Sequence, residues 1–105
     1  MKIIYINTSN NKQTLVELKE KNKIIDKEIS SSKLEKSEAV LPLINELLKR
    51  NNLKISDIDG IEVFEGPGSF TGLRVGVSIA NALGFLLGLP VNGKKVGTCV
   101  SPVYN

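Results

Sequence analysis

The sequence predicts an α/β domain built on a mixed five-stranded sheet, with its elements in the order β-β-β-α-β-α-β. Two observations predict this class. Residues 2–29 alternate between β-rich apolar runs and tight turns, which is typical of an antiparallel meander. Residues 37–91 hold two segments with helical apolar spacing, and a short apolar run follows each of them. A helix between two such runs favours a crossover connection, which joins parallel strands.

Three strands are expected in the first part of the chain, over residues 2–7, 14–18 and 24–29. The linkers between them, Ser9-Asn10-Asn11-Lys12 and Lys21-Asn22-Lys23, have the composition of turns. Because connections this short join antiparallel neighbours, the three strands are expected to form one meander.

The first helix is expected over residues 37–50. Apolar side chains recur along it at helical spacing on one face, at Val40, Leu41, Ile44, Leu47 and Leu48. Ser32 and Glu35 match a capping box ahead of it. Because a helix interior rejects proline, we place the start so that Pro42 falls near the first turn. Asn51-Asn52 ends the helix.

The chain is expected to continue with a fourth strand over residues 61–65, a second helix over residues 73–87 and a fifth strand. The fifth strand begins at Leu89-Pro90-Val91, and Asn92-Gly93 is a turn after it. This order of elements is that of a ribonuclease-H-like or actin-like half-domain. The chain has 105 residues, of which 41% are apolar, so we expect a single domain, over residues 1–105, with its own core. Residues 94–105 are expected to form a tail that we assign to no element.

The composition disfavours several classes of site. Cys99 is the single cysteine and histidine is absent, so neither a disulfide framework nor a Cys/His metal set can be built. The net charge of +3 comes from lysines scattered among acidic neighbours, which favours a solvated surface over a nucleic-acid patch. A run of carboxylates is expected in turns and on the surface rather than around a metal: Asp57, Asp59, Glu62 and Glu65.

No targeting or membrane segment is expected. The apolar run at the amino terminus is too short for a signal peptide. Residues 75–91 are apolar, but Ser78, Asn81 and Pro90 interrupt them, so a buried helix is favoured over a membrane span. We therefore expect a cytoplasmic protein.

A glycine loop, Gly-Pro-Gly-Ser-Phe-Thr-Gly-Leu-Arg over residues 66–74, joins the fourth strand to the second helix. Such a loop usually predicts an anion site, because free amides and the helix dipole point at it. The phosphate-binding loop of nucleotide hydrolases needs Lys and Ser/Thr after its last glycine, whereas Leu73-Arg74 follow here. The dinucleotide fingerprint fails because one residue too many separates Gly68 from Gly72. The loop therefore has the shape of a phosphate cradle without its chemistry.

Small residues recur every four positions in the second helix, at Gly72, Gly76, Ala80, Gly84 and Gly88. Glycine costs a helix about 1 kcal/mol relative to alanine, so we expect the row to allow another backbone to come close. Two interpretations stay open. The row packs against the chain's own sheet and first helix, or part of this surface, together with the first helix, meets a partner protein.

The glycine loop, with Val75-Gly76-Val77 and Gly88-Leu89-Pro90-Val91 after it, resembles the signature of the TsaB (YeaZ) family. Ser37-Glu38 ahead of Leu41-Pro42-Leu43-Ile44 resembles the first helix of that family, and Ile6-Asn7-Thr8-Ser9 resembles its opening strand and turn. The signature positions in the loop are Gly66, Pro67, Gly68, Ser69, Phe70, Thr71, Gly72 and Arg74.

Members of this family take part in making N6-threonylcarbamoyladenosine in tRNA. The resemblance implies an actin-like (ASKHA) fold and a non-catalytic role beside TsaD, the related protein that carries the transferase site, with the ATPase TsaE as a further partner. It also implies pairing through the two helices, as a homodimer or with TsaD. The interface residues expected on this basis are Leu41, Ile44, Leu48, Gly72, Leu73, Gly76, Val77 and Ala80.

Several departures from the family pattern point away from catalysis. Asn7 stands where the family has an aspartate, Lys36 replaces a histidine, and the usual second actin-like domain is expected to be missing. Ser69 and Thr71 have no histidine to activate them as nucleophiles. We expect no catalytic, cofactor or metal residues, and no binding of ATP or a divalent metal. A degenerate nucleotide-binding protein and a stand-alone homodimeric interaction module are the alternatives, and direct contact with tRNA is left open.

Overall fold

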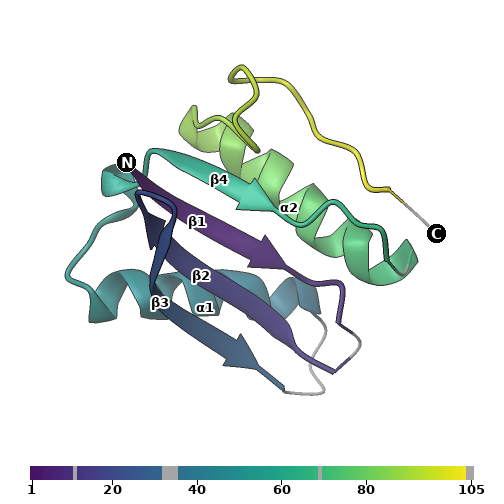
Figure 1. The fold of residues 1–105 in the computed structure, drawn as a ribbon, viewed down its shortest axis with the longest axis horizontal. Helices are drawn as coiled ribbons and strands as arrows, with labels where there is room; N and C mark the ends of the chain where they lie inside the picture. The colour runs from purple at the N-terminus through teal and green to yellow at the C-terminus, as the bar shows by residue number, and fades with distance from the viewer. Residues whose placement is uncertain (11, 32–35, 69, 104–105) are drawn as a thin grey trace.

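The computed structural model describes residues 1–10, 12–31, 36–68 and 70–103. Their strands form a four-stranded mixed sheet in the order β3-β2-β1-β4 (Figure 1). The strands are β1 (Lys2–Asn7), β2 (Thr14–Glu20), β3 (Lys23–Ser30) and β4 (Gly60–Val63). The pairs β1–β2 and β2–β3 are antiparallel and β1–β4 is parallel, which confirms the predicted meander and the first crossover.

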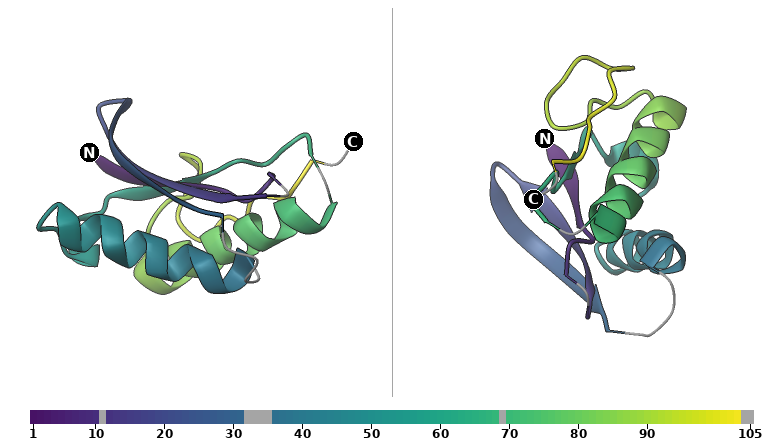
Figure 2. Two further views of the ribbon diagram at one scale, coloured as in Figure 1. Left: turned by 90° about the horizontal axis from the view of Figure 1, so that it is seen from below. Right: turned by 90° about the vertical axis from the view of Figure 1, so that its right-hand side faces the viewer.

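Two helices, α1 (Lys36–Arg50) and α2 (Phe70–Leu87), lie on one face of the sheet and leave the other face open (Figure 2). Between them the short 3₁₀ turn η1 (Ile55–Asp57) precedes β4. Side chains of the sheet and of both helices meet in one core, in which Ile6, Leu47 and Ala80 are fully buried. In the described part of the chain, none of the helices has the length and apolar character needed to cross a membrane.

Pro42 is the first correction, because it lies inside α1 rather than near its first turn. The helix begins at Lys36, so the proline falls in its second turn. A proline there removes the donor that would bond to the carbonyl of Glu38 and crowds that carbonyl. The chain tolerates this because Pro42 is on the exposed side of the helix, where water can reach the backbone. The capping box predicted from Ser32 and Glu35 lies outside the described residues.

The predicted fifth strand is the second correction. Residues 90–92 run beside β4, but they pair with it through a single isolated bridge between Val91 and Ile61. The segment is short because the chain turns directly after it, with positive φ at Asn92 (54°) and Gly93 (71°). Pro90 also has no N–H to donate to a ladder. The sheet therefore has four strands among the described residues.

The side chain of Asn92 replaces part of the missing strand. Its Oδ1 accepts the amide of Val63 at 2.8 Å, and its Nδ2 donates to the carbonyl of Val63 at 3.1 Å. The same Nδ2 donates to Glu65 Oε1 at 2.5 Å. The side-chain amide of Asn92 thus makes the hydrogen bonds to Val63 that the backbone of a neighbouring strand would make. Val63 is the last residue of β4, which leads into the glycine loop.

We expect Asn92→Ala to lower the free energy of unfolding by about 1–3 kcal/mol, because it leaves the N–H and C=O of Val63 without these partners. The left-handed φ of residue 92 adds to the cost, since asparagine tolerates it better than alanine. Urea unfolding followed by circular dichroism measures the change. Asn45→Ala, on the exposed surface of α1, is the matched control. Equal stability of the two variants would contradict the role given to Asn92.

The predicted tail is partly attached to the domain. Asn81, on α2, donates from Nδ2 to the carbonyl of Val100 and accepts the Val100 amide at Oδ1, both at 2.9 Å. Further along, the amide of Val103 donates to the carbonyl of Glu65 at 2.6 Å. Val100 is buried in the core. Residues 100–103 therefore run back along α2 to the glycine loop (Figure 1).

Candidate partner-binding surface

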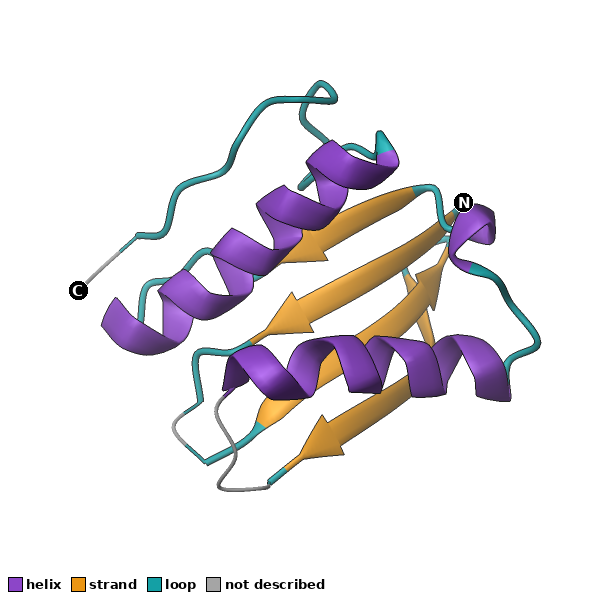
Figure 3. Cartoon of the chain, turned by 180° about the vertical axis from the view of Figure 1, so that it is seen from behind, coloured by secondary structure: helices purple, strands orange, loops and turns teal. Residues whose placement is uncertain are grey.

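The glycine loop follows β4 and continues into the first turn of α2, beside the end of β1 (Figure 3). The helix begins at Phe70, three residues earlier than predicted. Gly66 has φ of 120°, a conformation that side chains with a Cβ rarely adopt. A Cβ on Gly66 would also collide with the carbonyl oxygen of Val103. The side chain of Leu73, in the first turn of α2, packs against Gly66 and Gly68, and its Cδ1 would lie 3.4 Å from a Cβ on Gly68. Ser69 is outside the described residues.

Thr8, the residue after β1, holds the loop and α2 against the sheet. Its buried hydroxyl donates to the carbonyl of Gly72 at 2.5 Å and accepts the amide of Gly76 at 2.9 Å. In a regular α-helix those two backbone groups bond to each other, so the threonine hydroxyl lies directly against the helix backbone. A Cβ on Gly76 would lie 2.6 Å from Thr8 Oγ1. The contact therefore requires glycine at residue 76.

Asn7, which stands in place of the family's aspartate, bonds within its own turn. Its Oδ1 accepts the amide of Ser9 at 3.0 Å and the hydroxyl of Ser9 at 2.7 Å. Its Nδ2 donates to the hydroxyl of Tyr5 at 3.3 Å. Burial raises the pKa of Tyr5 above its ordinary value, so this phenol stays neutral at physiological pH. The polar side chains at the end of β1 thus shape the turn and its contact with α2.

The small-residue row of α2 faces the chain's own structure, as the first of the two interpretations expected. Besides Gly76 against Thr8, a Cβ on Gly84 would lie 2.5 Å from Cγ2 of Val91. Ala80 is fully buried. Gly88 follows α2 with φ of 68°, and a Cβ on it would meet none of the described atoms within 4 Å. The row brings α2 close to residues 8 and 91.

The eight predicted interface residues, which all lie in the described part of the chain, divide into two kinds. Seven are buried by the chain itself: Ile44, Leu48, Gly72, Leu73, Gly76, Val77 and Ala80. Leu41 leaves 53% of its surface exposed. Contact with a partner stays a prediction for this set, and Leu41 is the member whose side chain is available to one.

The outer side of the two helices carries further exposed residues that were not among the predicted interface residues. Phe85 and Leu86, near the end of α2, are 76% and 75% exposed. Earlier in α2 a shallow depression of about 300 Å³ is lined by Thr71, Arg74, Val75 and Ser78. The sequence pattern alone did not identify these positions, because α2 is apolar on nearly every side and the direction of the small-residue row was open. We call this side of α1 and α2, with Leu41, Ser78 and Phe85, the outer helix face.

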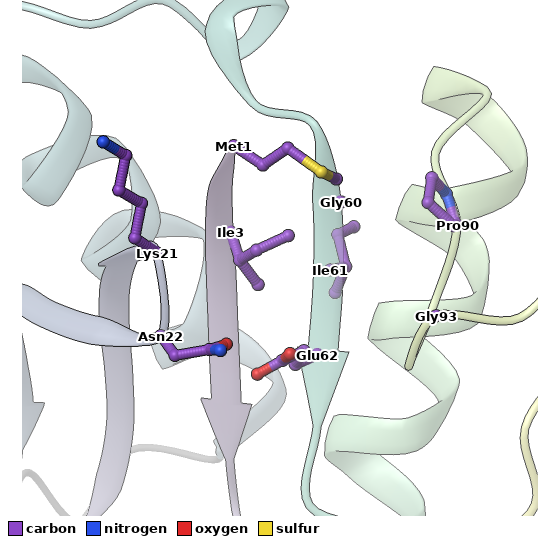
Figure 4. A pocket seen from close by; sticks show the side chains of 9 residues that line it. All are labelled: Met1, Ile3, Lys21, Asn22, Gly60, Ile61, Glu62, Pro90 and Gly93. Atoms are coloured by element: carbon purple, nitrogen blue, oxygen red, sulfur yellow. The ribbon is translucent and has the colours of Figure 1, made fainter.

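A second cavity lies on the open face of the sheet, at the start of β1 and β4. It has a volume of about 420 Å³ and an apolar floor that includes Ile3 and Pro90 (Figure 4). At one end the side chains of Asn22 and Glu62 point toward each other. Glu62 already forms an ion pair with Lys19, at 3.2 Å. Among the described residues, at this cavity and elsewhere, no three His, Cys, Asp or Glu side chains form a group that could hold a metal ion.

Comparison with known proteins relates the chain to proteins that are named for threonylcarbamoyladenosine in tRNA or its transferase. The family model described as "TsaD: tRNA N6-adenosine threonylcarbamoyltransferase" matches residues 23–95. The TsaB protein of Bacillus subtilis, described as a tRNA threonylcarbamoyladenosine biosynthesis protein, is 30% identical over all of this chain and half of its own length. A tRNA N6-adenosine threonylcarbamoyltransferase from Syntrophus aciditrophicus is 46% identical over 53% of this chain and 17% of its own length.

Solved structures share the fold. YeaZ from Pseudomonas aeruginosa superposes with a TM-score of 0.76 at 24% identity, covering 90% of this chain and 43% of that protein. The chain spans about half the length of the curated relatives it matches, or less.

Proposed function

Because the chain belongs to the threonylcarbamoyltransferase (TsaD) family and, within it, to the TsaB (YeaZ) proteins, we propose that it takes part in making threonylcarbamoyladenosine in tRNA. Its role is that of a non-catalytic partner of a TsaD-like transferase. One observation carries this proposal: the Thr8 hydroxyl bonds to the backbone of Gly72 and Gly76 and so holds α2 against the sheet. Thr8, Gly72 and Gly76 act on structure, and they fix the helix that bears the outer helix face.

The non-catalytic role is supported by the polar groups at the end of β1. Asn7 bonds to Ser9 and Tyr5, and Thr8 bonds to the backbone of α2. An actin-like kinase uses a carboxylate at the position of Asn7 around Mg²⁺ and phosphate, and an amide cannot supply that charge. These hydrogen bonds support a packing role for the end of β1.

The partner role is supported by the outer helix face. On α2 this face carries the exposed Phe85 and the depression lined by Thr71, Arg74, Val75 and Ser78, and on α1 it carries the exposed Leu41. Exposed apolar residues next to polar ones are typical of surfaces that bind other proteins. We propose that a TsaD-like protein covers this face, and that the chain forms a symmetric dimer through it when no transferase is present. A TsaE-like ATPase is a further proposed partner, and the cytoplasm is the proposed location.

Leu41→Asp is expected to weaken binding to the TsaD-like protein of the same organism at least about tenfold, because it would bury a charge in an apolar contact. Isothermal calorimetry measures the affinity. Ile24→Asp is a matched control, since Ile24 on β3 is 54% exposed against 53% for Leu41. It should bind as the unaltered chain does. If the TsaD-like protein binds the two variants with equal affinity, the outer helix face is not the contact. If it does not bind the unaltered chain, the partner role itself is wrong.

A further inference from the structure

β3 is an edge strand with a large apolar content. It pairs with β2 on one side, and the sheet order places it at the end of the sheet. Ile24, Ile25 and Ile29 are 54%, 49% and 40% exposed. An exposed apolar edge strand offers its unpaired N–H and C=O groups to a strand of another molecule. Natural sheets with such an edge usually carry a feature that prevents this pairing.

The backbone of Lys27, in the middle of β3, bonds to side chains. Its N–H donates to Oδ1 of Asp26 at 2.8 Å, and its C=O accepts from Nη2 of Arg50 at 3.1 Å. In an antiparallel pair, residues alternate between those bonded to the neighbouring strand and those directed away from it. Lys27 is of the second kind, so Asp26 and Arg50 occupy the two backbone groups that Lys27, in the middle of the strand, would offer to an added strand.

The two side chains that cover Lys27 also bond to each other. Arg50, the last residue of α1, donates from Nε and Nη2 to the carboxylate of Asp26, at 2.9 Å each, and from Nη1 to Glu28 at 2.5 Å. Asn51 donates to the same Asp26 carboxylate at 2.9 Å. Hydrogen bonds from Arg50, and then from Asn51, hold the pKa of Asp26 at about 2, so the pair is charged at physiological pH. The end of α1 is thereby fastened over the edge of the sheet.

We propose that Arg50 and Asp26, with the charge of Lys27, close the β3 edge against pairing with β3 of a second copy of this chain. An antiparallel register centred on Lys27 would bring Ile25 of one copy near Ile29 of the other, although Ile25 lies at a register shift in the β2–β3 pairing. Apolar pairs of this kind favour pairing. The same register would place Lys27 opposite Lys27, and Asp26 opposite Glu28. Like charges directly opposite each other disfavour pairing.

The sharpest test compares two triple variants that differ at one residue. Asp26→Ala/Lys27→Thr/Arg50→Ala frees the backbone of residue 27 and removes the opposing like charges. Asp26→Ala/Lys27→Pro/Arg50→Ala has the same net charge, but residue 27 then has no N–H for an added strand. Because that N–H points away from β2, the proline leaves the β2–β3 ladder intact. Sedimentation velocity over a range of concentrations measures association, with the unaltered chain as reference.

The threonine variant is expected to reach a higher mass than the unaltered chain as concentration rises, and the proline variant is expected to sediment as the unaltered chain does. A threonine variant that sediments like the unaltered chain would overturn the proposal. Equal association of the two variants would also overturn it, because the contact would then lie elsewhere.

A second measurement keeps the proposal testable if a triple variant fails to fold. Amide hydrogen exchange at Lys27 is expected to be slow in the unaltered chain and faster in Arg50→Lys, because lysine cannot supply the guanidinium's several donors at once. Lys49→Ala, which removes an exposed charge one residue earlier, is the control and should leave the rate unchanged. Equal exchange at Lys27 in Arg50→Lys and in the unaltered chain would contradict the closure of the edge.

Discussion

Gly76→Leu is expected to destabilise the chain by about 3 kcal/mol, at the upper end of the usual cost of overpacking. The first atom of the new side chain would already lie 2.6 Å from Thr8 Oγ1 and 3.3 Å from Thr8 Cγ2. Either α2 moves away from β1, or the hydroxyl gives up its bonds to Gly72 and Gly76. In a domain of this size such a loss lowers the melting temperature by roughly 4–8 °C per kcal/mol.

Ser78→Leu is the matched control for this experiment. It adds the same side chain to the same helix, two residues further on, at an exposed position. Circular dichroism melting of both variants should show a large drop for Gly76→Leu and little change for Ser78→Leu. A Gly76→Leu variant that melts like the unaltered chain would show that α2 does not depend on the contact with Thr8. Loss of TsaD binding by such a variant would then point to an external partner, and retained binding would mean that the spacing of the row is incidental.

Leu73→Ala is expected to lower the free energy of unfolding by about 2–5 kcal/mol, the range for a fully buried leucine. Leu73 is 1% exposed and packs under the glycine loop, where its Cδ1 would lie 3.0 Å from a Cβ on Gly66. Leu41→Ala removes the same atoms from a side chain that is 53% exposed, and should cost at most about 0.5 kcal/mol.

Urea unfolding separates the two leucine variants, and it also separates two roles that the sequence could not distinguish. Leu41 and Leu73 were both expected in a partner interface. If Leu73→Ala proves as stable as Leu41→Ala, the packing described for the glycine loop is wrong. If the stabilities differ as expected, Leu41 alone of the two remains a candidate for direct contact with a partner.

The elements that depend on local sequence were predictable. Turn residues such as Asn22 and Asn52 take positive φ (64° and 57°) where the sequence placed turns, and the apolar spacing of α1 gave its extent to within one residue. Two of the differences between the predicted and the observed elements involve proline. Pro42 is tolerated inside α1 because its side is exposed, and Pro90 helps limit residues 90–92 to one bridge. Exposure and long-range pairing are tertiary properties that a local pattern does not contain.

The site was predictable in its position and less so in its detail. The sequence drew attention to the glycine loop and to the small residues of α2, and the structure brings both together at Thr8. It could not show which helix residues face inward, because α2 is apolar on nearly every side. The ion pair between Arg50 and Asp26 links side chains that are 24 positions apart in the sequence, and nothing in the local sequence indicates it.

The most direct test of the central claim is the formation of threonylcarbamoyladenosine in tRNA by the TsaD-like transferase of the same organism, measured with and without this chain. The account predicts that product forms when both proteins are present, that this chain alone forms none, and that Ile24→Asp supports the reaction while Leu41→Asp does not. Product formed by this chain alone, or a transferase equally active without it, would contradict the account.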